Sequence, residues 1–451
     1  MPSRRHSLLD PHTAAFPPLE VRTVTLSLNA ADLGDRNLHR LCEGLYQRIV
    51  QRAGSFVAVC GNVSAEFGVP ILQRRVCVNP LDRLAEGFGT DDVVNIARTL
   101  DGAAAHVHVD QIAGYLARVP HGISAGARQL ILALPLVLSQ TERVQAAVEA
   151  ASSASGMSLG VLDLLGHKVK ETAEASAHRQ GIGAAKLAVL ANLPNEGPPI
   201  CGVCPGDGWG DAVIHVSVSA VGAIRHAVEQ RQLQCDQADL GVLAADIKAA
   251  AFQAARVAEL IGQEIAQRLG ADFGCIDVSL APTVRPGQTI AELLQRLGIA
   301  SFGSPGTAAA LMLLWSAMRT AGAFASTSAA NHAAVLLPIL RDAGLVAATE
   351  AGSLAIEHLE HLATVGGLGL DLLPVPGDIT PATLSAILAD QLATAVVNRR
   401  PAVVRLVPVP GKRAGERVSF GRDLGDAVVL DVPSVADSTF IQRGGRIPGF
   451  R

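Results

Sequence analysis

The sequence predicts an α/β domain in which the strands form a barrel-like arrangement. Apolar residues make up 49% and charged residues 17% of the 451-residue chain, so a large core is available and disorder is disfavoured. From about residue 21 to the end, segments with the two-residue period of strands alternate with helix-like segments. We therefore expect a flexible tail over residues 1–20 and a single domain over residues 21–451.

The elements follow from local patterns. Residues 21–28 alternate with period two, short apolar runs indicate buried strands, and longer Ala- and Leu-rich stretches indicate helices. The predicted strands are 21–28, 56–60, 105–109, 185–193, 212–219, 275–280 and 402–407. The predicted helices are 38–52, 91–100, 139–150 and 240–268. The Gly- and Pro-rich residues 195–210 lie between apolar segments, which favours an inserted loop over a domain boundary.

Composition excludes several classes of function. A formal charge of −4 with mixed signs and only 3% aromatic residues disfavours nucleic-acid binding. No apolar run has the eighteen or so residues of a membrane span, and the seven scattered cysteines are typical of reduced thiols in the cytoplasm. No phosphate-binding or dinucleotide-binding glycine motif occurs, so no nucleotide cofactor is predicted.

Three predicted strands carry polar residues on one face, because side chains alternate along a strand. These faces are His106, His108 and Asp110; His215, Ser217 and Ser219; and Cys275, Asp277 and Ser279. A sheet covered on both sides should be apolar on both, so the repeated polar face indicates a lumen or cleft. The alternative is a set of hydrogen-bonded core residues. His106, His108 and Asp110 are also candidate metal ligands, although the sequence does not identify the other ligands that a metal site would need.

Other candidates lie in loops. Cys201 and Cys204 have the spacing of a redox dithiol or half a zinc site, but the second half is missing, so inert thiols or a single reactive thiol, Cys204, remain alternatives. Ser304 and Thr307 precede an apolar helix whose first amides could bind an anion. In the tail, Arg443 and Arg446 flank Gly444 and Gly445, which suits carboxylate binding; the alternative is a turn that docks the C-terminus.

Several segments together resemble one uncharacterised bacterial family, often labelled PFL-like, whose fold is similar to the pyruvate formate-lyase barrel. The segments are 21–26, 169–173, 273–283, 303–311, 369–378, 402–408 and 440–448. The resemblance implies a ten-stranded α/β barrel with a loop entering its interior, and a homo-oligomer such as a homodimer. Asp371, Asp378, Arg405 and Glu171 also lie in such segments. The tail lacks the tyrosine of glycyl-radical motifs, which disfavours radical chemistry.

The leading hypothesis is a lyase or isomerase of small-molecule metabolism or biosynthesis that acts on a carboxylate-bearing metabolite inside the barrel. Arg443, Arg446 and the intervening glycine amides would hold the anion. Asp277 and Asp110 would act as acid–base groups with His215 or His108 as proton partner. The alternatives are a non-catalytic metabolite-binding or regulatory protein and a metal-dependent enzyme using His106, His108 and Asp110.

Overall fold

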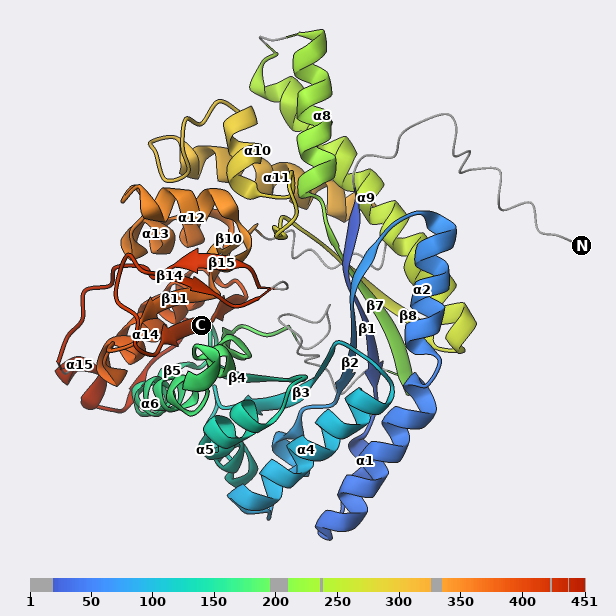
Figure 1. Ribbon diagram of the computed structural model, residues 1–451, viewed down its shortest axis with the longest axis vertical. Helices are drawn as coiled ribbons and strands as arrows, with labels where there is room; N and C mark the ends of the chain where they lie inside the picture. The colour runs from blue at the N-terminus through green and yellow to red at the C-terminus, as the bar shows by residue number, and fades with distance from the viewer. Residues whose placement is uncertain are drawn as a thin grey trace, which may run out of the picture.

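The protein is an α/β fold built on one large, mostly parallel sheet with helices on one of its faces (Figure 1). The computed structural model describes residues 19–194, 210–235, 238–325, 335–421, 424–436 and 438–450. The strand order is β12–β6–β4–β3–β2–β1–β7–β8, and β5 and β16 extend from β4.

The strands run in two directions. Parallel to one another are β1 (Glu20–Leu28), β2 (Ile71–Val78), β3 (Gln111–Arg118), β4 (Val144–Ser152) and β6 (Leu187–Ala191). The strands β7 (Ala212–Ser219) and β8 (Asp272–Ser279) are parallel to each other, and β7 is antiparallel to β1. At the other edge, β12 (Ala402–Val404) is antiparallel to β6. The carboxyl ends of the first five strands therefore lie at one end of the sheet, opposite those of β7, β8 and β12.

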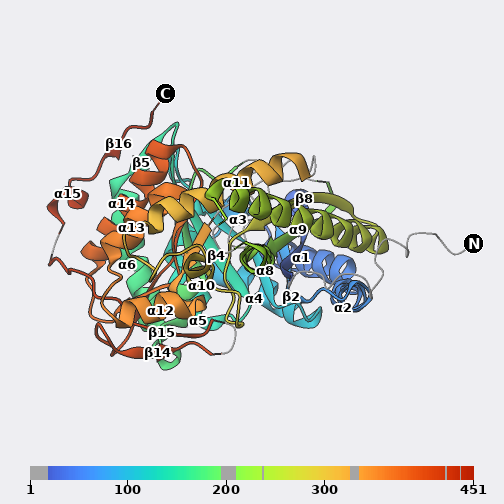
Figure 2. The ribbon, with the colours of Figure 1, turned by 90° about the horizontal axis from the view of Figure 1, so that it is seen from above.

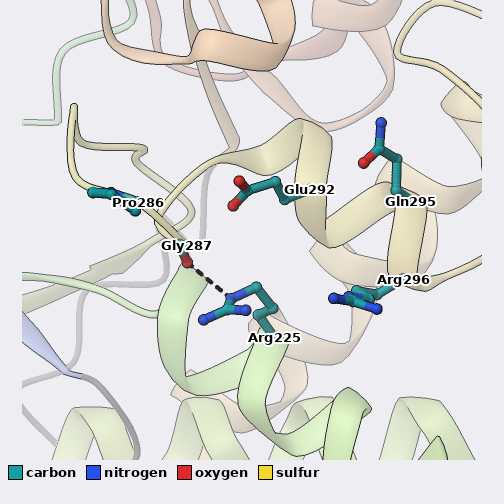
Figure 3. Close-up of a pocket in the computed structure, with 6 residues that line it drawn as sticks. All are labelled: Arg225, Pro286, Gly287, Glu292, Gln295 and Arg296. Carbon is teal, nitrogen blue, oxygen red and sulfur yellow. Dashed lines mark hydrogen bonds between the residues drawn. The ribbon is translucent and has the colours of Figure 1, made fainter.

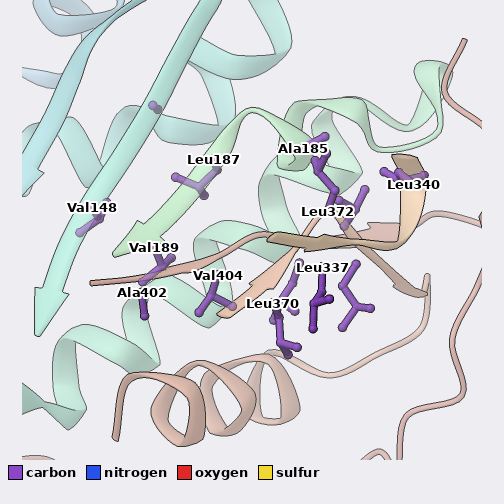
Figure 4. Packing of buried hydrophobic residues seen from close by; sticks show 14 of the residues in the cluster. Val148, Ala185, Leu187, Val189, Leu337, Leu340, Leu370, Leu372, Ala402 and Val404 are labelled. Atoms are coloured by element: carbon purple, nitrogen blue, oxygen red, sulfur yellow. The ribbon is translucent and has the colours of Figure 1, made fainter. Parts of the chain in front are cut away.

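Two further strands, β9 (Val335–Pro338) and β10 (Gly367–Asp371), continue the sheet beyond β12. They are parallel to each other, and the Arg405 amide after β12 donates to the Leu370 carbonyl of β10 over 2.9 Å. Gly369 permits this approach, because a Cβ there would lie 2.4 Å from the Val403 carbonyl oxygen. Apolar side chains fill the space between these strands and β6 (Figure 4). Within the described residues, no strand pairing joins β8 to β9.

The remaining short strands form two separate two-stranded sheets and one extension of the main sheet. β11 (Leu373–Pro376) pairs in parallel with β13 (Leu406–Val409), and β14 (Arg417–Ser419) pairs with β15 (Asp426–Val428). β5 (Gly156–Ser158) pairs with β16 (Arg446–Ile447) near the C-terminus.

Amphipathic helices cover the outside of the sheet (Figures 1 and 2). In α1, Leu41, Leu45 and Ile49 recur every four residues and are buried in the same core as Val24 and Leu26 of β1. The longer helices are α1 (Leu38–Ala53), α2 (Phe56–Phe67), α4 (Thr90–His106), α5 (Ala125–Gln140), α6 (Leu159–Ala175), α8 (Val221–Gln234), α9 (Leu240–Leu269), α11 (Thr307–Ala325), α13 (Ile356–Gly366) and α14 (Pro381–Asn398). The shorter ones are α3 (Leu81–Leu84), α7 (Ile182–Ala185), α10 (Ile290–Arg296), α12 (Ala343–Glu350) and α15 (Thr439–Gln442).

The sheet face opposite these helices, which we call the inner face, has a different character. It carries a small apolar cluster over β3, β4, β6 and β12, formed by Leu116, Ala147, Ala188, Leu190 and Val403. The rest of this face, over β2, β1, β7 and β8, is largely polar. No helix in the described parts of the chain combines the length and apolar character needed to cross a bilayer.

Several predicted elements are confirmed, notably the strands at 21–28, 212–219 and 275–280 and the helices at 38–52 and 240–268. Three are wrong. Residues 56–60 begin α2, which buries Phe56, Cys60 and Val63 at helical spacing, and residues 105–106 end α4. Residues 144–152 form β4 despite their helix-favouring Ala and Glu, because pairing with β3 and β6 overrides local propensity. The predicted tail, apart from its last two residues, and nearly all of the 195–210 loop lie outside the described residues.

Candidate functional site

Polar side chains of adjacent strands form two rows on the inner face. The first row crosses β2, β1, β7 and β8 and contains Gln73, Thr23, Ser217 and Asp277. The second row crosses β3, β2, β1 and β7 and contains Gln111, Arg75, Thr25 and His215. The rows are two residues apart along the strands, or roughly 7 Å. Arg75 donates two hydrogen bonds to Gln111 Oε1, at 3.0 and 2.7 Å.

The second row ends in a contact between a thiol and an imidazole. His215 Nδ1 lies 3.0 Å from Cys275 Sγ, and both side chains are buried. The pairing of β7 with β8 shifts register here, so that β8 has one residue more than β7. Gly274 makes room for the imidazole, because a Cβ at this position would lie 2.5 Å from His215 Cε1. The bulge and Gly274 thus position the Cys275 side chain in contact with the His215 ring.

The hydrogen bonds define the state of this pair. The Cys275 backbone amide also donates to His215 Nδ1, over 3.3 Å, so Nδ1 is an acceptor and the thiol is the second donor. Burial lowers the pKa of His215 from 6.5 to about 4, so the ring is neutral at neutral pH. The ring proton is therefore assigned to Nε2, and the pair is an uncharged thiol–imidazole pair.

A cationic cavity of about 400 Å³ lies where β1 and β2 begin and where the chain leaves β8. Arg22, Arg285 and Arg341 line it, together with Gln73 of the first row and Thr283. Arg22 is the extra residue of a second register shift, between β1 and β7. Glu20 accepts from Arg285 over 2.9 Å. Arginine side chains at the end of a polar row suit a ligand carboxylate.

A buried ion pair lies behind this cavity. Arg405 binds both carboxylate oxygens of Asp371, which ends β10, and both side chains are largely buried. Burial opposes ionisation of Asp371, but the charges of Arg405, Arg341 and Arg22 outweigh it and lower the pKa of this carboxyl. Because Arg405 binds both of its oxygens, the Asp371 carboxylate is held in one position. Its negative charge lies close enough to Arg22 and Arg341 to interact with both.

The structure brings together only some of the residues that the sequence suggested. His215, Asp277 and Ser279 share the inner face of β7 and β8, and Ser279 is 2% exposed. Asp110 lies elsewhere, because it forms an ion pair with Arg74 over 3.0 Å. It is the next residue of β2, Arg75, that belongs to the second polar row on the inner face. The expectation that Asp110 joins His215 is therefore wrong, because the alternation was applied to residues that do not form a strand.

The predicted metal ligands fail for the same reason. His106 is the last residue of α4, where its Nδ1 lies 3.1 Å from the Tyr46 hydroxyl. His108 follows the helix with φ of +56°. In the described residues, no group of three or more His, Cys, Asp or Glu side chains is placed to hold a metal ion.

The loop candidates are also separate from the two rows. Ser304 and Thr307 donate locally, to the carbonyls of Ser301 and Ser304. The tail residues 443–446 lie at β5, beyond β4 at a different part of the sheet from β7, and Arg446 donates to the Pro120 and Ser155 carbonyls. Gly444 and Gly445 have φ of +65° and +77°, as a docking turn requires. Cys201 and Cys204 lie outside the described residues.

A third feature is a surface cavity of about 600 Å³ between α8 and α10, lined by Arg225, Glu292 and Arg296 (Figure 3). Its two arginines both bind Glu229, at 2.8 and 3.1 Å. Because its charges are balanced and it lies among the outer helices, we place the candidate site at the cationic cavity and the two polar rows. Sequence reasoning missed Arg22, Arg75, Arg285 and Arg341, which belong to separate segments that only the sheet brings together.

Comparison with known proteins places the chain among uncharacterised relatives. Residues 15–426 match the family model "Uncharacterised ACR (DUF711)". A UPF0210 protein from Desulforudis audaxviator (strain MP104C) is 40% identical over 430 residues, covering 95% of this chain and 94% of the relative. A UPF0210 protein from Methanosarcina acetivorans is 39% identical over 430 residues, covering 95% and 92%. Neither name states an activity. The chain therefore belongs to the uncharacterised DUF711 family.

Proposed function

We propose that the protein is an enzyme of the lyase or isomerase type that acts on a small carboxylate-bearing metabolite on the inner face. One observation carries the proposal: a cavity lined by three arginines includes Gln73 of the first polar row, and the neighbouring second row ends in a buried thiol–imidazole pair. A substrate carboxylate bound by Arg22 and Arg341 would place its neighbouring carbon atoms beside Asp277 and Ser217.

The residues have distinct roles in an elimination. Asp277 takes a proton from the carbon next to the carboxylate, and the released electron pair forms a double bond as the leaving group departs. His215 donates its Nε2 proton to that group while the Cys275 thiol proton passes to Nδ1, so the imidazole stays neutral. Asp277 then carries one additional proton and Cys275 one fewer, and proton exchange with solvent restores both. In an isomerisation, the proton on Asp277 returns to another carbon.

We further propose that the sheet closes into a ten-stranded barrel similar to that of pyruvate formate-lyase. Three parallel groups support this proposal: β1, β2, β3, β4 and β6 are parallel, β7 is parallel to β8, and β9 is parallel to β10. The first group is flanked by antiparallel strands at both edges, in the pairs β1–β7 and β6–β12. Closure requires β8 to pair with β9, and an experimental structure without that pairing would exclude it.

The function is tested by incubating the purified protein with carboxylate metabolites and following conversion by mass spectrometry. Asp277→Asn should abolish conversion but keep ligand binding, because it preserves shape and removes the base. Arg341→Gln should weaken binding by about tenfold or more, since a charge-assisted hydrogen bond contributes ~1.5–3 kcal/mol. Glu171→Gln on the outer helix α6 is the matched control and should behave as wild type. Unchanged turnover in Asp277→Asn would refute the assignment.

A non-catalytic metabolite-binding protein is the second candidate, because every feature of the cationic cavity serves binding as well as catalysis. It predicts a ligand that raises the melting temperature of wild type but not of Arg341→Gln, and that is recovered unchanged. That pair of results would replace the enzymatic proposal.

A further inference from the structure

A second cavity lies at the opposite end of the sheet, at the carboxyl ends of β3, β4 and β6. Its volume is about 730 Å³, and it is lined by Asp82, Glu86, Arg118, His121, Glu149 and Asn192, among others. Ligand sites in α/β proteins commonly lie at the carboxyl ends of parallel strands. Because β7 and β8 run against β1, this cavity and the arginine-lined one are carboxyl-end cavities of opposite strand sets.

Most hydrogen-bond donors around the second cavity are already engaged within the protein. Arg118 binds Asp82 through two parallel contacts of 2.9 Å, which neutralises both charges. Arg446, beside the cavity, donates to the carbonyls of Pro120 and Ser155. The Asn192 amide donates to the carbonyls of Ala395 and Arg400.

Two carboxylates keep acceptor capacity. Glu149 of β4 is 9% exposed, and one of its oxygens accepts from the Leu193 amide over 3.1 Å. Glu86 likewise accepts from the Gly126 amide over 3.1 Å through one oxygen. Among the described residues, the second oxygen of each carboxylate has no hydrogen-bond partner. A carboxylate can accept about four hydrogen bonds, so this cavity offers acceptors where the other one offers donors.

We propose that this cavity binds a small organic cation, with the ammonium group of a primary amine between Glu149 and Glu86. An organic cation fits better than a metal ion, because the described residues contain no group of three or more His, Cys, Asp or Glu side chains placed for a metal. The volume also exceeds that of a single ion by far. This site is independent of the function proposed for the arginine-lined cavity.

The ionisation of Glu149 supports the choice of ligand. Burial raises the pKa of Glu149 to about 7, against the opposing effects of the Leu193 amide and Arg118. An ammonium group favours the ionised carboxylate, so amine binding should strengthen as pH rises through 7. The other charged or titratable groups facing this carboxyl are Asp82, Arg83, Glu86, Arg118 and His121, with Arg446 nearby.

The test uses three four-carbon probes of different charge, measured by calorimetry on the full chain: putrescine, 1,4-butanediol and succinate. Putrescine should bind at least about tenfold more tightly than the diol, because charge-assisted hydrogen bonds are the stronger ones. Glu149→Gln should remove that advantage, whereas Glu142→Gln, in a surface pair with Arg179, should not. Putrescine affinity should rise about tenfold from pH 6 to pH 8 in wild type and in His121→Ala, but not in Glu149→Gln.

Two results would overturn the proposal: putrescine binding no tighter than the diol, or equal putrescine binding by wild type and Glu149→Gln. If Glu149→Gln does not fold, the diol comparison and the pH dependence of wild type decide alone. Succinate reports on the other cavity, so its loss in Arg341→Gln with intact putrescine binding separates the two sites. A negative result for one of the two proposed sites therefore does not affect the test of the other.

Discussion

Replacing Gly274 with alanine tests how β8 holds the His215 imidazole. The new Cβ would lie 2.5 Å from His215 Cε1, 2.7 Å from Nδ1 and 2.7 Å from a methyl group of Val213. Carbon contacts in proteins are normally about 3.5–4.0 Å, so a shift of about 1 Å is required. His215 is 1% exposed, and Nδ1 is bound by both the thiol and the amide of Cys275, so the ring has little freedom to move.

The expected loss of unfolding free energy for Gly274→Ala is about 1–3 kcal/mol, the usual range for an overpacked core. Urea denaturation measures it. The matched control is Gly61→Ala in α2, where no heavy atom outside the local helix backbone lies within 4 Å of the new Cβ. The control should be stabilised by about 0.5–1 kcal/mol, since alanine favours a helix more than glycine does.

A second readout distinguishes local strain from general destabilisation. An NMR titration of His215 Cε1–H should show a pKa of about 4 in wild type and a higher value in Gly274→Ala, because a displaced ring loses part of its burial. If Gly274→Ala is as stable as wild type and titrates in the same way, the ring is not held as described.

Three further predictions concern buried ionisable groups. For His215, the folded pKa of about 4 lies below 6.5, so stability is lost as pH falls from about 6.5 to 4, by up to ~3 kcal/mol, and His215→Gln should abolish that slope in urea denaturation. For Glu149, the folded pKa of about 7 lies above 4.5, so stability is lost as pH rises through that window, and Glu149→Gln should flatten it. Asp371→Asn should cost about 3–5 kcal/mol, because it leaves the Arg405 charge buried without its anion. Glu171→Gln, at a half-exposed pair, should cost less than about 1 kcal/mol in the same assay.

The parts of the fold that the sequence predicts are those with clear periodicity. Residues 214–219 alternate strictly within β7 (Ala212–Ser219), and the polar positions His215 and Ser217 lie on one face as expected. Residues 144–152 lack this signal because β4 is buried between two parallel neighbours, which favours apolar residues on both faces, and four of its nine residues are Ala. Their Ala-rich composition therefore resembles that of a helix.

The candidate site was predicted only in part, for a physical reason. His215, Asp277 and Ser279 belong to adjacent strands, so local alternation finds them. Arg22 faces the cavity because of a register shift, and Arg285 and Arg341 follow two strands that are far apart in sequence. No local sequence pattern indicates that the segments containing these three arginines come together in the fold. By contrast, the spacing of the tail arginines predicted a carboxylate site, but Arg446 donates its hydrogen bonds to the backbone carbonyls of Pro120 and Ser155.

The most direct test of the proposed site is a crystal structure of the full-length protein soaked with succinate. The account predicts density for one carboxylate within hydrogen-bond distance of Arg22 and Arg341, with the carbon chain extending along the first polar row toward Asp277. Density for succinate only at the outer surface, with the inner face filled by protein side chains, would contradict it.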